Sequence, residues 1–221
     1  MKKYLSIFLY AILGGICIGL GGTVFLRIKD AFTGGNVVGA LLFTIGLFTI
    51  CTRGYNLFTG KACYIFDNKP DYLLTLVVIW IGNLCGCCLI AAIESFTSLC
   101  GESGINAVAA GMVEGKMSSG LISLFLLGIM CNIFIYIAVN GYAKNPHELG
   151  KYLSLFFGVS VFILCGTEHS IADMYYWAVS GILSSQPGES LLRILIVSLG
   201  NVVGGVSFPL VEKVYAKLNE E

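Results

Sequence analysis

The chain has 221 residues, of which 57% are hydrophobic and 12% are charged, and its formal net charge at pH 7 is zero. This composition lies far outside the range of soluble globular domains. A neutral chain also lacks the positive charge that supports nucleic-acid binding. The composition therefore predicts a membrane protein without a nucleic-acid partner.

Six apolar segments, each near the ~20 residues needed to cross a bilayer, use nearly the whole chain. They cover residues 4–26, 31–52, 72–93, 121–139, 153–179 and 194–211. The first segment is too long for the apolar part of a signal peptide, and Leu26-Arg27-Ile28-Lys29 offers no small-residue cleavage site. We expect it to be retained, and we expect residues 1–221 to form one all-α transmembrane domain without an extramembrane domain.

Lysine and arginine in the connectors indicate the orientation. With the N-terminus inside, the inner ends carry eight basic residues and the outer ends four: Lys2, Lys3, Lys61, Lys69, Lys144, Lys151, Lys213 and Lys217 against Arg27, Lys29, Lys116 and Arg193. This bias, and the even number of segments, predict a multi-pass protein of the cytoplasmic (inner) membrane with both termini in the cytoplasm.

The second and fifth segments look interrupted. The second passes through Arg53-Gly54-Tyr55-Asn56 before it resumes, and Cys165-Gly166-Thr167 follows the apolar start of the fifth. Glycine and asparagine disfavour helix, and non-helical backbone at membrane depth survives only inside protein or beside a cavity. We therefore expect two broken helices at a conduction site.

The third and sixth segments share a pattern. Gly82-Asn83-Leu84-Cys85-Gly86 recurs as Gly200-Asn201-Val202-Val203-Gly204. A copy that begins after three spans starts on the opposite side of the membrane. The pattern therefore predicts a 3+3 inverted repeat with halves at about residues 1–95 and 117–215, typical of transport proteins. The alternative is that small residues merely permit close helix packing, and both can hold.

Nine cysteines are present without a Cys-x-x-Cys pair. Their single cluster, Cys85, Cys87 and Cys88, fits small buried side chains better than a metal site. No metal or cofactor is expected.

Ionisable residues within the fifth segment are its most informative feature. Glu168-His169-Ser170 and Asp173 have apolar residues on both sides, and such groups at membrane depth are costly and usually functional. The other histidine, His147, lies in a polar connector. Because imidazole has an unperturbed pKa of about 6.5, His169 is the natural site for proton or hydrogen-bond chemistry.

From the second segment to the sixth, these motifs and their joint spacing resemble the formate/nitrite transporter family. The matching residues are Phe43 and Leu47, Leu57-Phe58-Thr59, Lys116, Asn132, Phe162, Glu168-His169-Ser170 and Gly200-Asn201-Val202-Val203-Gly204-Gly205. The resemblance implies an aquaporin-like fold of six spans and a homopentamer in the bilayer with one pore per subunit. It also implies passage of small monovalent anions such as formate, nitrite, hydrosulfide, acetate or lactate, with two hydrophobic constrictions around the central histidine.

Permeation then has a physical explanation. Desolvating an anion at apolar constrictions is costly, and five side chains would form these: Phe43, Leu47, Leu57, Phe58 and Phe162. Lys116 would attract the anion, and His169 would give it a proton or a hydrogen bond. In the same pathway, Thr59 and Asn132 would bind the substrate or fix the imidazole, and Glu168 would anchor the break.

Structural alternatives stand beside these roles. Because Lys116 lies two residues after Glu114, the alternative is that it is a solvated charge in a loop. For Thr59 the alternative is that its hydroxyl only caps a helix end. Phe43 and Phe162 would be ordinary core or lipid-facing aromatics.

Three residues depart from the family pattern. Arg53 lies in the second-segment break and is expected to pair with Asp173, which replaces the family's usual asparagine, and Lys61 is an addition. These changes leave the particular anion open.

The rival function is an aquaporin-like channel for water or small neutral solutes. That class carries two Asn-Pro-Ala motifs, whereas Asn145-Pro146 here lies in a connector and precedes His147. An enzyme is not expected, because the chain has one buried histidine and no nucleophile motif.

Overall fold

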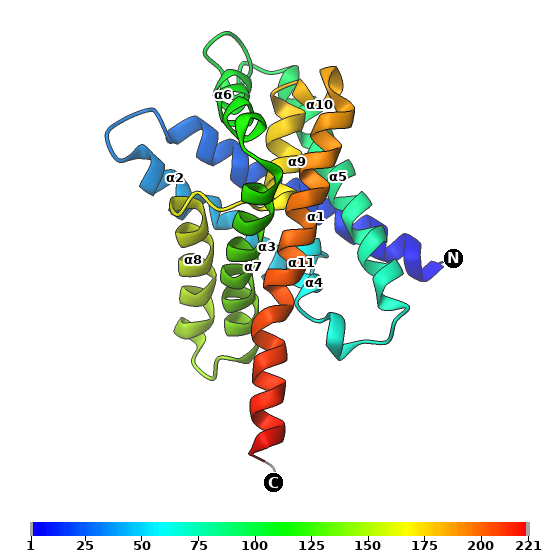
Figure 1. Ribbon diagram of the computed structural model, residues 1–221. Coiled ribbons are helices and arrows are strands. Elements are labelled where there is room, and N and C mark those ends of the chain that lie inside the picture. The colour runs from blue at the N-terminus through cyan, green and yellow to red at the C-terminus, as the bar shows by residue number, and fades with distance from the viewer. Residues whose placement is uncertain (1, 220–221) are drawn as a thin grey trace.

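The computed structural model describes residues 2–219, and within these bounds the regular elements are all helices. Figure 1 shows their arrangement. In chain order they are α1 (Lys2–Ile28), α2 (Gly35–Phe43), α3 (Ile45–Arg53), α4 (Phe58–Ala62), the short 3-10 helix η1 (Ile65–Asp67), α5 (Tyr72–Ser95), α6 (Ile105–Ser118), α7 (Leu121–Lys144), α8 (Glu148–Leu164), α9 (Ser170–Val179), α10 (Ile182–Ser185) and α11 (Pro187–Leu218).

Five stretches of the described chain are long and apolar enough to cross a membrane. Four of them are the single helices α1, α5, α7 and α11, and the fifth is the stretch Gly35–Arg53, which is formed by α2 and α3 together. Large apolar side chains also cover the outside of the molecule, such as Leu73 and Val77 on α5 and Leu195 and Leu199 on α11. An outer surface of this kind is stable in contact with lipid, whereas in water it would drive association.

Two pairs of long helices, α1 with α5 and α7 with α11, pack through glycines. A Cβ added to Gly15 would lie 2.1 Å from the carbonyl oxygen of Asn83, and one on Gly86 would lie 2.2 Å from that of Ile12. In the second pair, a Cβ on Gly204 would lie 2.0 Å from the carbonyl oxygen of Ile129. The small residues of both Gly-Asn patterns therefore let the helix backbones touch.

Helical structure stops at two points inside the bundle. Helix α3 ends before Gly54 (φ 71°) and α4 begins at Phe58, while α8 ends before Gly166 (φ 65°) and α9 begins at Ser170. Both glycines adopt the left-handed conformation that commonly terminates a helix. The extended backbone after each one brings the start of α4 and the start of α9 towards each other.

The asparagines of the two Gly-Asn patterns hold these interruptions in the same way. Asn83 donates to the carbonyl of Asn56 (2.9 Å) and accepts from the amide of Phe58 (2.9 Å). Asn201 donates to the carbonyl of Glu168 (2.9 Å) and accepts from the amide of Ser170 (2.9 Å). Each asparagine thus hydrogen-bonds the backbone groups that flank one residue, Leu57 in the first case and His169 in the second. Non-helical backbone inside a membrane protein requires such partners.

Each asparagine also donates to a helix of its own part of the chain. Asn83 reaches the carbonyl of Ala11 on α1 (2.7 Å), and Asn201 reaches that of Gly128 on α7 (2.8 Å). We name these two sets of bonds the Asn83 clamp and the Asn201 clamp.

Candidate functional site

His169 is fixed at both ring nitrogens. As the residue that caps α9, it accepts the amide hydrogen of Ala172 at Nδ1 (3.1 Å), and its Nε2 lies 2.9 Å from the hydroxyl oxygen of Thr59. Because Nδ1 accepts, the hydrogen of a neutral imidazole is on Nε2 and points to Thr59. The bond joins α9 to α4 across a sequence separation of 110 residues.

Asn132 supports Thr59 from α7. Its amide donates to the carbonyl of Thr59 (3.0 Å), and all of its side chain is buried. Its other atom, Oδ1, has no hydrogen-bond partner among the described residues. Asn132 therefore positions the backbone that carries the Thr59 hydroxyl, and it leaves one acceptor free.

Lys116 pairs with two carboxylates. Its ammonium contacts Glu168, which precedes the histidine, and lies 3.0 Å from Oδ1 of Asp173 on α9. The Lys116 side chain is only 15% exposed, so it is not a solvated loop charge. Arg193 of α11 holds this end of α6, because its guanidinium donates to the carbonyls of Lys116 (3.0 Å) and Ser119 (2.7 Å).

The expected pairing of Arg53 with Asp173 was therefore wrong. Arg53 ends α3 at the exposed surface, and Lys116 is the partner of Asp173. The connector between the third and fourth segments folds into helix α6, and this helix packs against α9. Charge matching along the sequence did not predict this tertiary contact.

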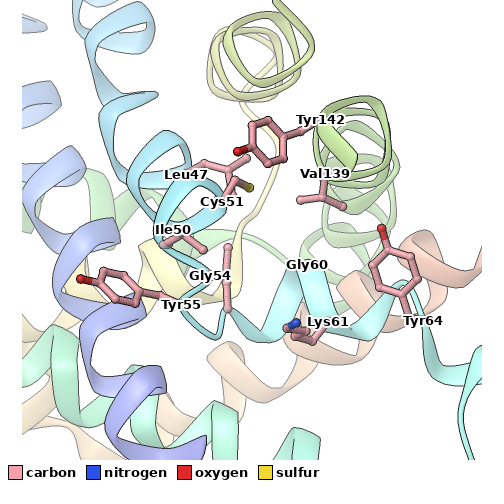
Figure 2. A pocket seen from close by; sticks show the side chains of 11 residues that line it. Leu47, Ile50, Cys51, Gly54, Tyr55, Gly60, Lys61, Tyr64, Val139 and Tyr142 are labelled. Carbon is pink, nitrogen blue, oxygen red and sulfur yellow. The ribbon is translucent and has the colours of Figure 1, made fainter. Parts of the chain in front are cut away.

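Two pockets adjoin the residues of the Thr59–His169 contact: His169 lines the first, and Leu57 and Gly60, which flank Thr59 in the chain, line the second. The first, which we name the Lys116 pocket, has a volume of about 100 Å³ and includes His169, Asp173 and Tyr176 in its wall. The second, the Lys61 pocket, has a volume of about 170 Å³ and is lined by Lys61, Tyr64 and Tyr142 among others (Figure 2). No ion pair is formed by Lys61 within residues 2–219.

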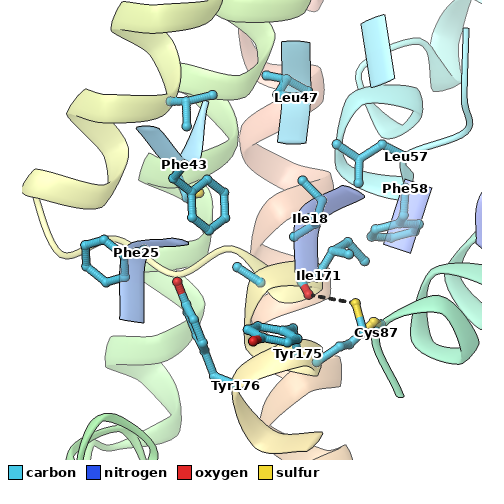
Figure 3. Close-up of a cluster of buried hydrophobic side chains, with 14 of the residues drawn as sticks. Ile18, Phe25, Phe43, Leu47, Leu57, Phe58, Cys87, Ile171, Tyr175 and Tyr176 are labelled. Carbon is cyan, nitrogen blue, oxygen red and sulfur yellow. Dashed lines mark hydrogen bonds between the residues drawn. The ribbon is translucent and has the colours of Figure 1, made fainter. Parts of the chain in front are cut away.

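Apolar side chains separate these pockets. Phe43 and Phe162 line the Lys116 pocket with ring centroids 6.4 Å apart, edge to face, and Phe162 stacks on His169 at 5.4 Å. Leu47 and Leu57 line the Lys61 pocket. Each of these four apolar residues is at most 3% exposed, and three of them are labelled in the cluster of Figure 3.

Phe58 belongs to the same buried cluster but lines neither of the two pockets (Figure 3). Its side chain lines a groove between α5 and α11 together with Trp80 and Leu199. In a helix, consecutive side chains point about 100° apart. Since Thr59 faces His169, Phe58 must turn away from it.

The sequence did not single out two aromatic residues of the Lys116 pocket, Phe25 on α1 and Tyr176 on α9 (Figure 3). For Tyr176 a signal existed, because it lies three positions after Asp173 and thus on the same helix face. Phe25 had none, because it sits in a segment that is apolar throughout.

Cys87, from the cysteine cluster, is buried and its thiol donates to the carbonyl of Ile171 at 3.4 Å. Across residues 2–219, no group of three or more histidine, cysteine or acidic side chains is placed to hold a metal ion.

The family model described as formate/nitrite transporter matches residues 1–215 of the chain. The chain belongs to the formate/nitrite transporter family. As a member with several apolar helices, it is a multi-pass membrane protein.

Individual relatives agree. Formate-nitrite transporter 2 of Toxoplasma gondii is 32% identical over 183 residues, which are 76% of this chain and 39% of the relative. The nitrite transporter NirC of Escherichia coli is 29% identical over 212 residues, covering 85% and 77% of the two chains. The chain spans only 31% of the length of an uncharacterized transporter of Saccharomyces cerevisiae. The relatives are named as transporters or channels, not as enzymes.

A solved structure titled a pentameric formate channel with formate bound shares the fold. Its TM-score is 0.79 at 24% identity, and the match covers 100% of this chain and 99% of that chain.

Proposed function

We propose that this protein is a channel or transporter for small monovalent weak-acid anions, and that the path runs from the Lys116 pocket past His169 to the Lys61 pocket. The observation that carries the proposal is the Thr59–His169 pair, a buried polar contact whose histidine lines the Lys116 pocket, while Leu57 and Gly60, which flank Thr59, line the Lys61 pocket. The names of the relatives, which include formate and nitrite transporters, support this substrate class. The buried charges of the Lys116 pocket disfavour a pathway for water alone.

Each group on the path has a physical task. Lys116 provides positive charge in a confined pocket and so favours arrival of an anion. Phe43 and Phe162, and then Leu47 and Leu57, exclude water, so that a fully hydrated ion does not pass. His169 donates a hydrogen bond from Nε2–H to the passing substrate, which replaces Thr59 as the acceptor.

The hydrogen-bond role of His169 is favoured over proton donation. A proton on Nδ1 would remove the acceptor that caps α9 through Ala172. The first helical amides have no partner within the helix, and the loss of such a cap costs about 1 kcal/mol. The neutral ring keeps the cap and still presents a donor to the path.

The proposed architecture has six spans, with α2–α4 and α8–α9 as the interrupted second and fifth. The identical bonding of the Asn83 and Asn201 clamps supports an inverted repeat over about residues 1–95 and 117–215. The bias of basic residues supports cytoplasmic termini in an inner membrane, and the pentameric title of the structural neighbour supports a homopentamer.

The test is uptake of formate and nitrite into proteoliposomes by the wild type and by His169→Asn. Asparagine is a good helix cap, so α9 keeps its start, but its shorter side chain does not reach Thr59. We expect uptake to fall at least about tenfold, the effect of losing a ~1.4 kcal/mol stabilisation of the permeating species.

Two results would contradict the proposal. Unchanged anion uptake by His169→Asn would remove His169 from the path. A wild type that passes water or glycerol but neither anion would make it a neutral-solute channel, which light-scattering measurements of vesicle swelling would reveal.

A further inference from the structure

The charges around Lys116 do not balance. Its single ammonium contacts Glu168 and Asp173, whose side chains are 7% and 2% exposed. If all three groups are ionised, the cluster has a net charge of −1 in a setting with little water. A buried charge without a partner is strongly unfavourable, and two carboxylates that share one site commonly retain a proton.

Asp173 is the member with an unused atom. Its Oδ1 faces Lys116, whereas Oδ2 is buried and has no hydrogen-bond partner in the described part of the chain. As an ionised oxygen, Oδ2 would lack every bond that a buried carboxylate needs. As a protonated oxygen it is a donor, and Asp173 lines the same pocket as His169.

Among residues 2–219, Lys116 is the cation that pairs with Glu168 and Asp173, and no second cation does so. The ionisable groups beside Asp173 are Lys116, Glu168, His169, Tyr176 and Cys131. The elements that pack against α9 carry further groups, which include Arg27 on α1, Glu94 and Cys87 on α5, Glu114 on α6, Arg193 on α11 and Lys61 on α4, and none of these pairs with Asp173 or Glu168. Arg27 and Glu114 are exposed. Glu94 of α5 contacts another face of α9, where its carboxylate accepts a hydrogen bond from the hydroxyl of Tyr175 (2.8 Å). Arg193 binds Glu189 and backbone carbonyls, and Lys61 belongs to the other pocket.

We propose that Asp173 is a proton-binding site and that the Lys116 pocket receives an anion only while Asp173 is protonated. With that proton the cluster of Lys116, Glu168 and Asp173 is neutral, and a monovalent anion can approach the ammonium. Without the proton the cluster is negative and repels the anion. This inference rests on the proposed function, and it makes a proton from the solution on the Lys116 side the second ligand of the pocket.

The transfer step is balanced in atoms and charge. The O–H of Asp173 hydrogen-bonds to the anion, the O–H bond breaks, and the proton goes to the anion, which leaves as the neutral acid past Phe43 and Phe162. Asp173 remains as a carboxylate, and a proton from the solution on the Lys116 side restores it. One anion and one proton therefore cross together, without a net charge at the apolar rings.

The experiment measures formate uptake into proteoliposomes as a function of concentration, at a series of external pH values above the range in which formate itself titrates. For the wild type, we expect the KM to increase with pH once Asp173 ionises, with a limit of about tenfold per pH unit for one proton. In Asp173→Asn the cluster is neutral at every pH, so its KM should stay constant. Its maximal rate should fall, because the proton donor is gone.

Two further variants make the result specific. Glu168→Gln leaves Lys116 with Asp173 alone, which makes a neutral pair without a proton, so the pH dependence of the KM should vanish here too. Glu94→Gln changes a buried carboxyl outside both pockets and should retain the wild-type pH dependence. If Asp173→Asn does not fold, as judged from its elution and melting in detergent, Asp173→Ser takes its place, because it also leaves Lys116 and Glu168 as a neutral pair.

The outcomes are separable. A wild-type KM that does not change with pH, or variants at Asp173 and Glu168 that keep the wild-type dependence, would overturn the assignment of the proton to Asp173 while anion transport stands. A wild type that moves no formate or nitrite at any pH would overturn the proposed function and this inference together.

Discussion

At the scale of single residues, the site combines groups that the chain places far apart. Thr59, Lys116, Asn132 and His169 come from α4, α6, α7 and the segment before α9. Family spacing was enough to select all four from the sequence. Their bonding was not predictable in detail, because a pattern of spacings does not say whether Asn132 contacts a substrate or the backbone of Thr59, as it does here.

Lys61 is the residue whose environment gives the clearest further prediction. It puts a positive charge beside the hydroxyl-bearing Tyr64 and Tyr142 in the Lys61 pocket. We expect Lys61→Gln to raise the KM for anions supplied from that side about twofold to fivefold, since a partly exposed charge is worth less than about 1 kcal/mol. The effect should weaken at high salt.

The matched control is Lys69→Gln, which removes an exposed lysine that does not line the pocket. Uptake into vesicles that contain the protein in a single orientation measures both variants. Equal effects of the two substitutions would show that general surface charge, and not the pocket, attracts the anion.

At the scale of elements, the ends of α3 and α8 were predictable, and the clamps that bind the chain after them were not. Gly54 and Gly166 indicate where helices end. The Gly-Asn pattern indicated a repeat, but not that Asn83 and Asn201 bind the interruptions, because their partners lie on other segments. Helix α6 was not predicted, because it lies between the third and fourth apolar segments and is too short to cross a membrane.

The clamps make a stability prediction. Asn201→Leu keeps a similar volume but leaves the amide of Ser170 and the carbonyls of Glu168 and Gly128 without their side-chain partner. Each unsatisfied buried group costs about 1–3 kcal/mol. We expect a clear decrease in the thermal stability of the protein in detergent, and loss of anion uptake.

Asn140 offers the comparison. It is half-buried in α7 and its Oδ1 makes no hydrogen bond, so Asn140→Leu should leave the melting temperature nearly unchanged. Melting curves from intrinsic fluorescence would measure both. Similar melting temperatures for the two variants would show that the Asn201 clamp contributes no stability.

At the scale of the whole molecule, composition alone predicted a helical membrane protein, and the pattern of basic residues adds a prediction of its orientation. We expect green fluorescent protein fused after the C-terminus to fluoresce, and alkaline phosphatase at the same point to be inactive, because that end should lie in the cytoplasm. Fusions in the α5–α6 connector should give the reverse result. An active phosphatase at the C-terminus would contradict the predicted orientation.

The contacts at the centre have a mechanical consequence. Helix α4 is tied to His169 and to Asn132 of α7, and α9 packs on α5 while α11 packs on α4, so each proposed half inserts its short helix into the other. Two halves joined in this way cannot rock past each other without breaking buried hydrogen bonds. We therefore expect the bundle and the His169 ring to stay in place during permeation and the rings of Phe43 and Phe162 to be the moving parts. Side-chain rotations are in general faster than the microsecond-to-millisecond domain motions of an alternating-access carrier.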